Sequence, residues 1–123
     1  MILVDTSIWV NHLRARLAGL EILVALGQLR NHPFVTGELA VGDPREWGRV
    51  VALLGALPAV RLATESEFLE LIAAESLAGT GLGFVDVHLL ASCRLTPGTR
   101  LWSGDKRLAR HAERLGVAWT DAD

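Results

Sequence analysis

The alternation of short apolar segments with longer segments of helical periodicity is the strongest constraint on the fold of this chain. Ile2–Asp5 begins with three large apolar residues, two of them β-branched, as expected of a short buried strand. Arg100–Ser103 has the same character, and Ala59–Leu62 and Val117–Trp119 are weaker strand candidates. Strands that alternate with helices predict an α/β fold around a mainly parallel sheet.

The helical segments are predicted from apolar spacing and from residues typical of helix starts. The hydroxyl groups of Thr6 and Ser7 suit the N-cap of the first helix, and Pro44 suits the first turn of a later one. A short helix is also expected in the segment around Glu38. The predicted helices are Ser7–Leu17, Ala18–Leu29, a helix from Pro44 through Leu54, Glu65–Ala78, Gly83–Cys93 and Asp105–Leu115.

Length and composition predict a single domain, residues 1–123, without repeats or linkers. Twelve basic and fourteen acidic residues leave a net charge of −2, which argues against gross electrostatic capture of nucleic acid but allows a local basic patch. A single cysteine, Cys93, cannot build a disulfide framework. No apolar run reaches the ~18–20 residues of a membrane span, and no charged leader precedes the first apolar stretch. We therefore expect a cytoplasmic protein that does not enter a membrane.

Four carboxylates lie inside or at the edge of apolar segments: Asp5, Glu38, Asp86 and Asp105. Asp5 and Asp105 would lie near the carboxyl ends of predicted strands, where open parallel sheets form their ligand sites. Glu38 and Asp86 would enter the same crevice from helices. Because converging carboxylates repel one another, a cation is expected to neutralise them, and oxygen ligands favour Mg²⁺ or Mn²⁺ over Zn²⁺.

Each of these acids also has a purely structural interpretation. Asp5 and Asp105 are good N-cap residues for the helices that follow them. Glu38 could pair with an arginine, and Asp86 could stabilise the positive end of its helix dipole. Only the joint placement of the four favours a metal site.

The four acidic blocks together resemble a PIN domain, and more narrowly the VapC-type toxins of bacterial toxin–antitoxin pairs. The blocks are V-D-T-S-I-W, H-P-F-V-T-G-E-L, G-F-V-D-V-H-L-L-A-S and L-W-S-G-D-K-R-L, spread over essentially the whole chain. The resemblance implies a three-layer α/β/α domain with Mg²⁺- or Mn²⁺-dependent endoribonuclease activity. It also implies that Asp5, Glu38, Asp86 and Asp105 are the catalytic, metal-binding acids.

The same resemblance extends to neighbouring hydroxyl groups and to a partner. Thr6, Ser7 and Ser103 match positions whose hydroxyls orient carboxylates or metal-bound water. Many relatives carry a further acid at the position of Arg107, so tight binding of a second metal by protein alone is in doubt. The implied partner is a small VapB-like antitoxin whose C-terminal segment covers the active site.

RNA would need basic groups near an acidic centre. Arg107, Arg110 and Arg114 have the spacing of a stripe on the last helix, and Arg14 and Arg16 form a second candidate patch. An ordinary solvated helix face is the alternative for both. The four tryptophans, Trp9, Trp47, Trp102 and Trp119, could in principle stack on bases. Trp9 and Trp102 flank acidic motifs in apolar context and suit the core, whereas Trp47 is expected to be the most exposed.

Two apolar segments, Ala18–Leu29 and Arg45–Leu57, carry more hydrophobic surface than a small monomer easily buries. We expect them to form a homodimer contact or an antitoxin-binding groove. A response-regulator receiver is rejected, because Asp5 has no acidic neighbour and the stretch from Gly48 to Leu62 contains no acid. A PIN nuclease that acts on DNA and a non-catalytic module that binds a partner or RNA remain as alternatives.

Overall fold

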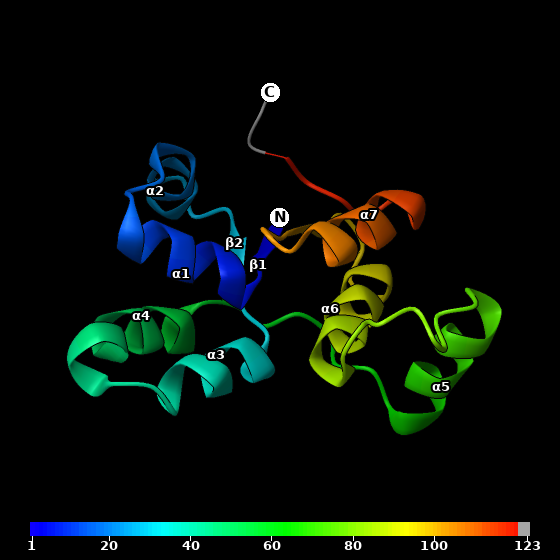
Figure 1. Cartoon of the computed structure of the whole chain (residues 1–123). Coiled ribbons are helices and arrows are strands. Elements are labelled where there is room, and N and C mark those ends of the chain that lie inside the picture. The colour runs from blue at the N-terminus through cyan, green and yellow to red at the C-terminus, as the bar shows by residue number, and fades with distance from the viewer. Residues whose placement is uncertain (121–123) are drawn as a thin grey trace.

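The computed structural model describes residues 1–120, so that residues 121–123 of the predicted domain lie outside the described part. Residues 1–120 form three strands and seven helices, most of which are labelled in Figure 1. In chain order they are β1 (Ile2–Val4), α1 (Thr6–Arg14), α2 (Ala18–Ala25), β2 (Leu29–Arg30), α3 (Pro33–Ala40), α4 (Pro44–Ala56), α5 (Glu65–Ala74), α6 (Phe84–Leu95), β3 (Arg100–Trp102) and α7 (Lys106–Arg114).

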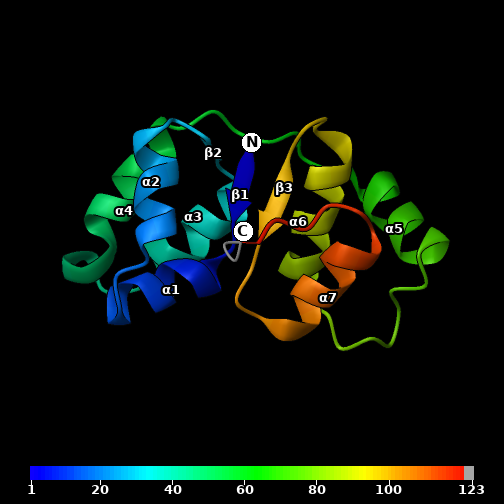
Figure 2. The ribbon, with the colours of Figure 1, turned by 90° about the horizontal axis from the view of Figure 1, so that it is seen from above.

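The strands form one parallel sheet in the order β2-β1-β3. Ile2 pairs with Leu29 on one side and with Arg100 on the other, which places β1 in the centre. Helices α1–α4 gather on one side of the sheet and α5–α7 on the other (Figures 1 and 2). The predicted α/β class with a parallel central sheet is confirmed, and the carboxyl ends of β1 and β3 are brought together.

The second predicted helix is too long at its C-terminal end. Helix α2 stops at Ala25, and Leu29, which was assigned to it, belongs to β2. Gly27 has a φ of +66°, a left-handed conformation that ends a helix and that favours glycine. Leu29 is then free to pair with Ile2, a contact between distant residues that local periodicity does not reveal.

Two of the strand candidates are single bridges. Asn31 pairs with Ala59, and Leu101 pairs with Ala118, each in parallel orientation. Helix α5 likewise ends at Ala74 and not at Ala78, and Ser76 follows with a φ of 55°. The predicted elements are present, but only three segments of the described chain have formed strands.

The hydrophobic core surrounds β1 and the inner face of α6. Leu89 and Leu90 on α6 have no exposed surface, and Leu3 of β1 is almost completely buried. Trp9 and Trp102 are buried as predicted, but the prediction that Trp47 is exposed was wrong: it is 9% exposed and packs beside Gly42, where a Cβ would lie 2.8 Å from its Cδ1. Across residues 1–120, no helix has the length and apolar character needed to cross a membrane.

Candidate active site

Asp5 is the residue on which the site is built. It lies directly after β1, where its backbone N–H donates to the carbonyl of Trp102 in β3 at 2.9 Å, and it is 7% exposed. It occupies the N-cap position of α1, yet its side chain makes no capping hydrogen bond. The capping interpretation of Asp5 is therefore wrong, and so is the prediction that Thr6 or Ser7 caps this helix.

Two serine hydroxyls hold one oxygen of the Asp5 carboxylate. Ser7 Oγ donates to Asp5 Oδ2 at 2.8 Å, and Ser103 Oγ donates to the same atom at 2.7 Å. Ser103 Oγ also accepts from the backbone N–H of Asp105 at 3.0 Å. Within residues 1–120, Oδ1 of Asp5 makes no hydrogen bond, so this oxygen can bind a ligand while Oδ2 fixes the orientation.

Gly104 completes this network, and the sequence analysis did not identify it. Its backbone N–H donates to Ser7 Oγ at 2.8 Å. A Cβ at this position would lie 2.8 Å from Nδ2 of Asn11 and 3.4 Å from Ser7 Oγ. Its position could have indicated this role, because Gly104 stands between a serine and an aspartate directly after a strand. A residue without a Cβ there lets its backbone N–H approach another side chain closely.

Glu38 reaches the site from α3. Thr6 Oγ1 donates to Glu38 Oε1 at 2.9 Å, which links the start of α1 to this exposed carboxylate. The alternative in which Glu38 pairs with an arginine is not found among residues 1–120. The hydroxyl next to Asp5 therefore positions a second acid, whereas Ser7 positions the first.

Asp86 lies in the first turn of α6 and is half-buried. Its Oδ2 accepts the backbone N–H of Gly83 at 2.9 Å. Burial raises the pKa of the Asp86 carboxyl, the hydrogen bond from Gly83 opposes this, and the negative charges of Asp5 and Asp105 raise the pKa further. The structure thus places three of the four acids within electrostatic range of one another.

Asp105 has both of the roles considered for it. It is the N-cap of α7, and its Oδ1 accepts the backbone N–H of Leu108 at 3.0 Å, so the capping interpretation is confirmed. Its charge also acts on Asp86. Capping uses one carboxylate oxygen and leaves the other available.

Hydrogen bonds link Asp5 to Asp105 through Ser103 and Glu38 to Thr6 beside Asp5, and the charges of Asp5 and Asp105 act on Asp86. These four acids, called the acidic site, do not form a closed ligand cage. In the part of the chain that the structure describes, no three His, Cys, Asp or Glu side chains stand close enough together to hold a metal ion. The donor set nevertheless fits a divalent cation: all donors are carboxylate oxygens, Asp5 is buried with one unpaired oxygen, and like charges raise the pKa of Asp86. Mutual repulsion is what a bound cation would relieve.

The predicted basic residues have different surroundings. Arg114 donates to the carbonyl of Glu75 at 3.0 Å and lies 3.5 Å from its carboxylate, and Arg107 donates to the carbonyl of Gly81 at 3.4 Å. Arg16 forms an ion pair with Glu21. Of the predicted stripe on α7, only Arg110 has no ion pair or carbonyl acceptor within residues 1–120, so the stripe is not one continuous free surface.

Comparison with known proteins agrees with this geometry. The family model of the PIN domain matches residues 2–114, which include all four acids and Ser103. This chain belongs to the PIN domain family. Relatives include the protein named Ribonuclease VapC32 from Mycobacterium tuberculosis, in strains CDC 1551 / Oshkosh and ATCC 25618 / H37Rv. Each is 44% identical over 118 residues, covering 96% of this chain and 95% of the relative. No solved structure matches the chain.

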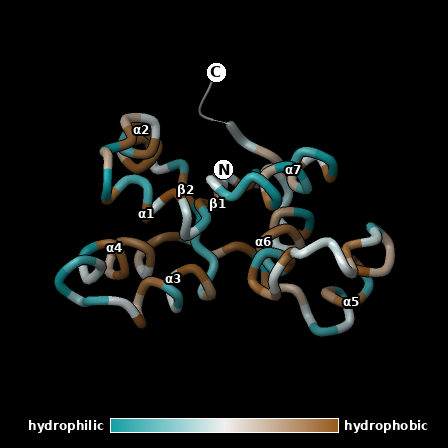
Figure 3. The backbone as a smooth tube through the Cα atoms, viewed as in Figure 1, coloured by the Kyte–Doolittle hydropathy of each residue, from teal (hydrophilic) through white to brown (hydrophobic). Residues whose placement is uncertain are grey.

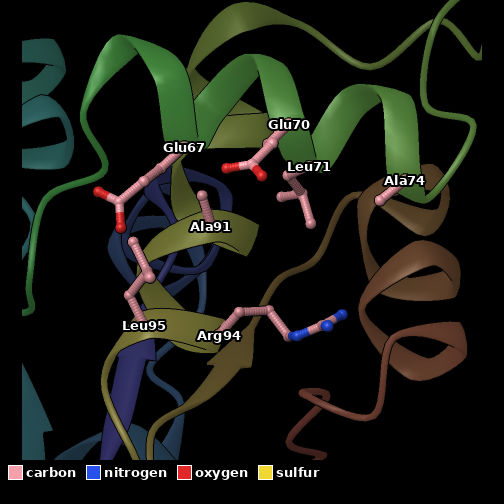
Figure 4. Close-up of a pocket in the computed structure, with 7 residues that line it drawn as sticks. All are labelled: Glu67, Glu70, Leu71, Ala74, Ala91, Arg94 and Leu95. Carbon is pink, nitrogen blue, oxygen red and sulfur yellow. The ribbon is translucent and has the colours of Figure 1, made fainter.

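These matches confirm the predicted resemblance to VapC-type PIN domains. The acidic site of this PIN domain is separate from a hollow of the molecule that lies between α5 and α6 (Figure 4). That hollow is lined by Glu67, Glu70 and Leu71 of α5 and by Ala91, Arg94 and Leu95 of α6. It contains none of the four acids, and its Arg94 lies 3.5 Å from the carboxylate of Glu75.

Proposed function

We propose that this PIN domain, a single domain spanning the chain, is a metal-dependent endoribonuclease and the toxin of a toxin–antitoxin pair. The predicted class of function, a VapC-type ribonuclease, is confirmed by the family match and by the 44% identical relative. The observation that carries the chemistry is the Asp5 carboxylate, held by Ser7 and Ser103 across two strand ends beside Asp86 and Asp105. The alternatives, a nuclease acting on DNA and a non-catalytic module, are less favoured.

The cofactor of this proposal is Mg²⁺ or Mn²⁺, held by oxygens of Asp5, Glu38, Asp86 and Asp105. When bound, such an ion supplies Lewis-acid chemistry and a water of lowered pKa. The residues of the chain supply the orientation: Ser7 and Ser103 fix Asp5, Thr6 fixes Glu38, and Gly83 fixes Asp86. Pre-organised carboxylates of this kind need little rearrangement when a ligand binds.

The histidines have other tasks, which agrees with chemistry that needs no histidine base. His12 Nδ1 accepts the backbone N–H of Leu17, and His32 Nδ1 accepts that of Phe34. His88 stacks on the ring of Phe68, with ring centroids 4.3 Å apart. His111 lies beside Arg114.

Hydrolysis of RNA by the purified chain, with and without Mg²⁺, tests the proposal. We expect cleavage that depends on the metal and that is lost in Asp86→Asn, which preserves size and the acceptor for Gly83 but removes the charge. Sequencing of the RNA ends after brief expression would identify the cleavage site, with Asp5→Asn as the inactive control. Cleavage by Asp86→Asn at the wild-type rate would contradict the site, and equal cleavage of DNA would favour the alternative substrate.

The proposal includes a VapB-like antitoxin and a homodimer. Figure 3 shows hydrophobic residues along α2 and α4, and Ile22 and Leu26 of α2 are 57% and 64% exposed. A groove lined by Leu20, Val24, Val50 and Leu53 lies between these helices. Native mass spectrometry of the chain, alone and co-expressed with any short protein that proves to be encoded next to it, tests both assemblies. We expect Ile22→Lys to weaken at least one of them.

A further inference from the structure

Another cavity lies beside α7 and is lined in part by Ser103, whose hydroxyl donates to Asp5 of the acidic site. It has a volume of about 530 Å³, within the usual range of ligand pockets. Its lining includes Trp102, Ser103, Lys106, Arg110 and Trp119. In Figure 2, α7 and the segment that follows it lie beside β3, and these elements form the cavity walls.

One wall of the cavity is aromatic and firmly held. The rings of Trp102 and Trp119 have centroids 4.6 Å apart and are tilted by 58°. Trp102 is 6% exposed, whereas Trp119 is only half-buried. The backbone N–H of Trp119 donates to the carbonyl of Leu101 at 2.9 Å, so the backbone that carries this ring is attached to the edge of the sheet. A fixed, partly exposed indole can stack on another flat ring.

Helix α7 contributes two cations to the lining of this cavity. Lys106 and Arg110 are four residues apart and therefore lie on the same face of α7. Both are exposed, and neither forms an ion pair within residues 1–120, in contrast to Arg16 and Arg114. Figure 3 shows α7 as largely hydrophilic. The one acid in this lining, Glu113, also has no ion pair with them in the described part of the chain.

Ser103 links the cavity to the acidic site. It lines the cavity and donates its hydroxyl to Asp5, and Lys106 directly follows Asp105. A polyanion that approaches the four carboxylates is repelled by them. Cations beside the acidic site would offset that repulsion for the part of the strand that is not being cleaved.

We propose that this cavity is a nucleotide subsite for the RNA strand, next to the position of cleavage. A base stacks on Trp119, and two backbone phosphates bind Lys106 and Arg110. Aromatic rings accept every base because each base has a π-face, and basic side chains recognise the backbone without regard to sequence. This inference rests on the proposed function, because it assumes that a single-stranded nucleic acid reaches the acids.

Binding without divalent metal tests the subsite separately from catalysis. The probe is a fluorescein-labelled single-stranded RNA of mixed sequence, titrated with the wild-type chain in EDTA and followed by anisotropy. For Lys106→Gln/Arg110→Gln we expect weaker binding and a slope of log K against log salt that is smaller by about 1.4, since two phosphate contacts are lost. The matched control Arg45→Gln/Arg61→Gln removes the same charge from residues outside the cavity and should keep the wild-type slope.

Trp119 is tested with two variants, because its contact with Trp102 also contributes to packing. We expect Trp119→Leu to weaken RNA binding by about 5- to 100-fold and Trp119→Phe to retain most of it. Thermal melting shows whether each variant is folded. If Trp119→Leu proves unfolded, quenching of tryptophan fluorescence by RNA in the wild type, reduced in Trp119→Phe, provides the same test.

The outcomes separate this inference from the proposed function. Wild-type binding in the lysine–arginine variant, or equal loss in its control, would overturn the subsite even if the chain cleaves RNA. Failure of the wild type to bind RNA, or equal binding of an acidic polypeptide such as polyglutamate, would also overturn it. If the wild type shows no metal-dependent cleavage but its RNA binding still depends on Lys106, Arg110 and Trp119, only the proposed nuclease activity is refuted.

Discussion

Two junctions between a strand and a helix show how similar positions acquire opposite chemistry. Asp5 follows β1 at the N-cap of α1, and His32 follows β2 at the N-cap of α3. Both residues are buried. His32 accepts the N–H of Phe34 and caps its helix, whereas Asp5 makes no capping bond and is held by two serines. A polar N-cap residue that does not cap is available for a ligand.

The surroundings explain the difference. His32 lies against Phe34 and His88, with ring centroids 4.8 Å and 6.4 Å away. Burial and the nearby His88 lower the pKa of His32 to about 4, so it stays neutral at physiological pH. Since its Nδ1 accepts a hydrogen bond, its proton is on Nε2, which has no partner within residues 1–120. Asp5 instead receives hydroxyl donors that suit an ionised carboxylate.

Asp5→Asn should have the largest effect. The amide oxygen can still accept from Ser7 and Ser103, so the fold should survive, but the charge is lost. We expect RNA cleavage to fall by a factor on the order of 100 to 1000. Initial rates with Mg²⁺, together with the melting temperature, provide the measurement. If a folded Asp5→Asn chain cleaved RNA at the wild-type rate, the Asp5 carboxylate would take no part in catalysis. Its role would then be structural, like that of His32.

The pH dependence of stability tests the histidine side of the comparison. Because the pKa of His32 is about 4 when folded and 6.5 ordinarily, the unfolded chain takes up a proton first as the pH falls. The contribution of His32 to the free energy of unfolding is fully present above pH 6.5. It is lost as the pH falls from 6.5 to 4, by up to about 3 kcal/mol. Urea unfolding of His32→Asn, which can still cap α3, should show a flatter pH profile than the wild type.

A matched histidine variant serves as the control for this profile. His12→Asn changes a half-buried histidine that lies outside the group formed by His32, Phe34 and His88. This variant should keep the wild-type fall in stability between pH 6.5 and 4. An unchanged profile in His32→Asn would mean that the junction after β2 does not hold a neutral histidine.

Removing one serine should have an intermediate effect on activity. Ser103→Ala deletes a donor to Asp5 Oδ2 and the acceptor for the N–H of Asp105. We expect cleavage to fall about 10- to 100-fold, with most activity retained in Ser103→Thr. Ser66→Ala on the exposed face of α5 is the control. Equal rates for Ser103→Ala and the control would show that Asp5 needs no hydroxyl support.

Asp105 should show the smallest effect on stability and separates capping from charge. Asp105→Asn retains an acceptor for the N–H of Leu108, whereas Asp105→Ala loses it and should cost about 1 kcal/mol of unfolding free energy. Both variants should cleave RNA poorly. Denaturant unfolding and cleavage rates are measured on the same samples. If Asp105→Asn remained active, the role of Asp105 would be purely structural.

Much of the fold followed from local patterns. β1, β3 and α4 were predicted close to their observed ends, because apolar runs, Pro44 and an acidic first turn act over a few residues. The assignment of Leu29 to a helix and the exposure of Trp47 were wrong. The first depends on a contact with the distant Ile2, and the second on how α4 packs against the preceding helix α3, which residue type and spacing do not reveal.

Residue types and their spacing were enough to identify the ordered set of four acids, their hydroxyl neighbours and the PIN family. The role of each polar group became visible only in the folded chain. Ser7 and Ser103 both donate to Asp5, and Arg107 and Arg114 donate to backbone carbonyls. Lys106 and Arg110 line the same cavity as Trp119. The physical reason is that hydrogen bonds and ion pairs need their partners within about 3–4 Å, and parallel strands bring such partners from opposite ends of the chain.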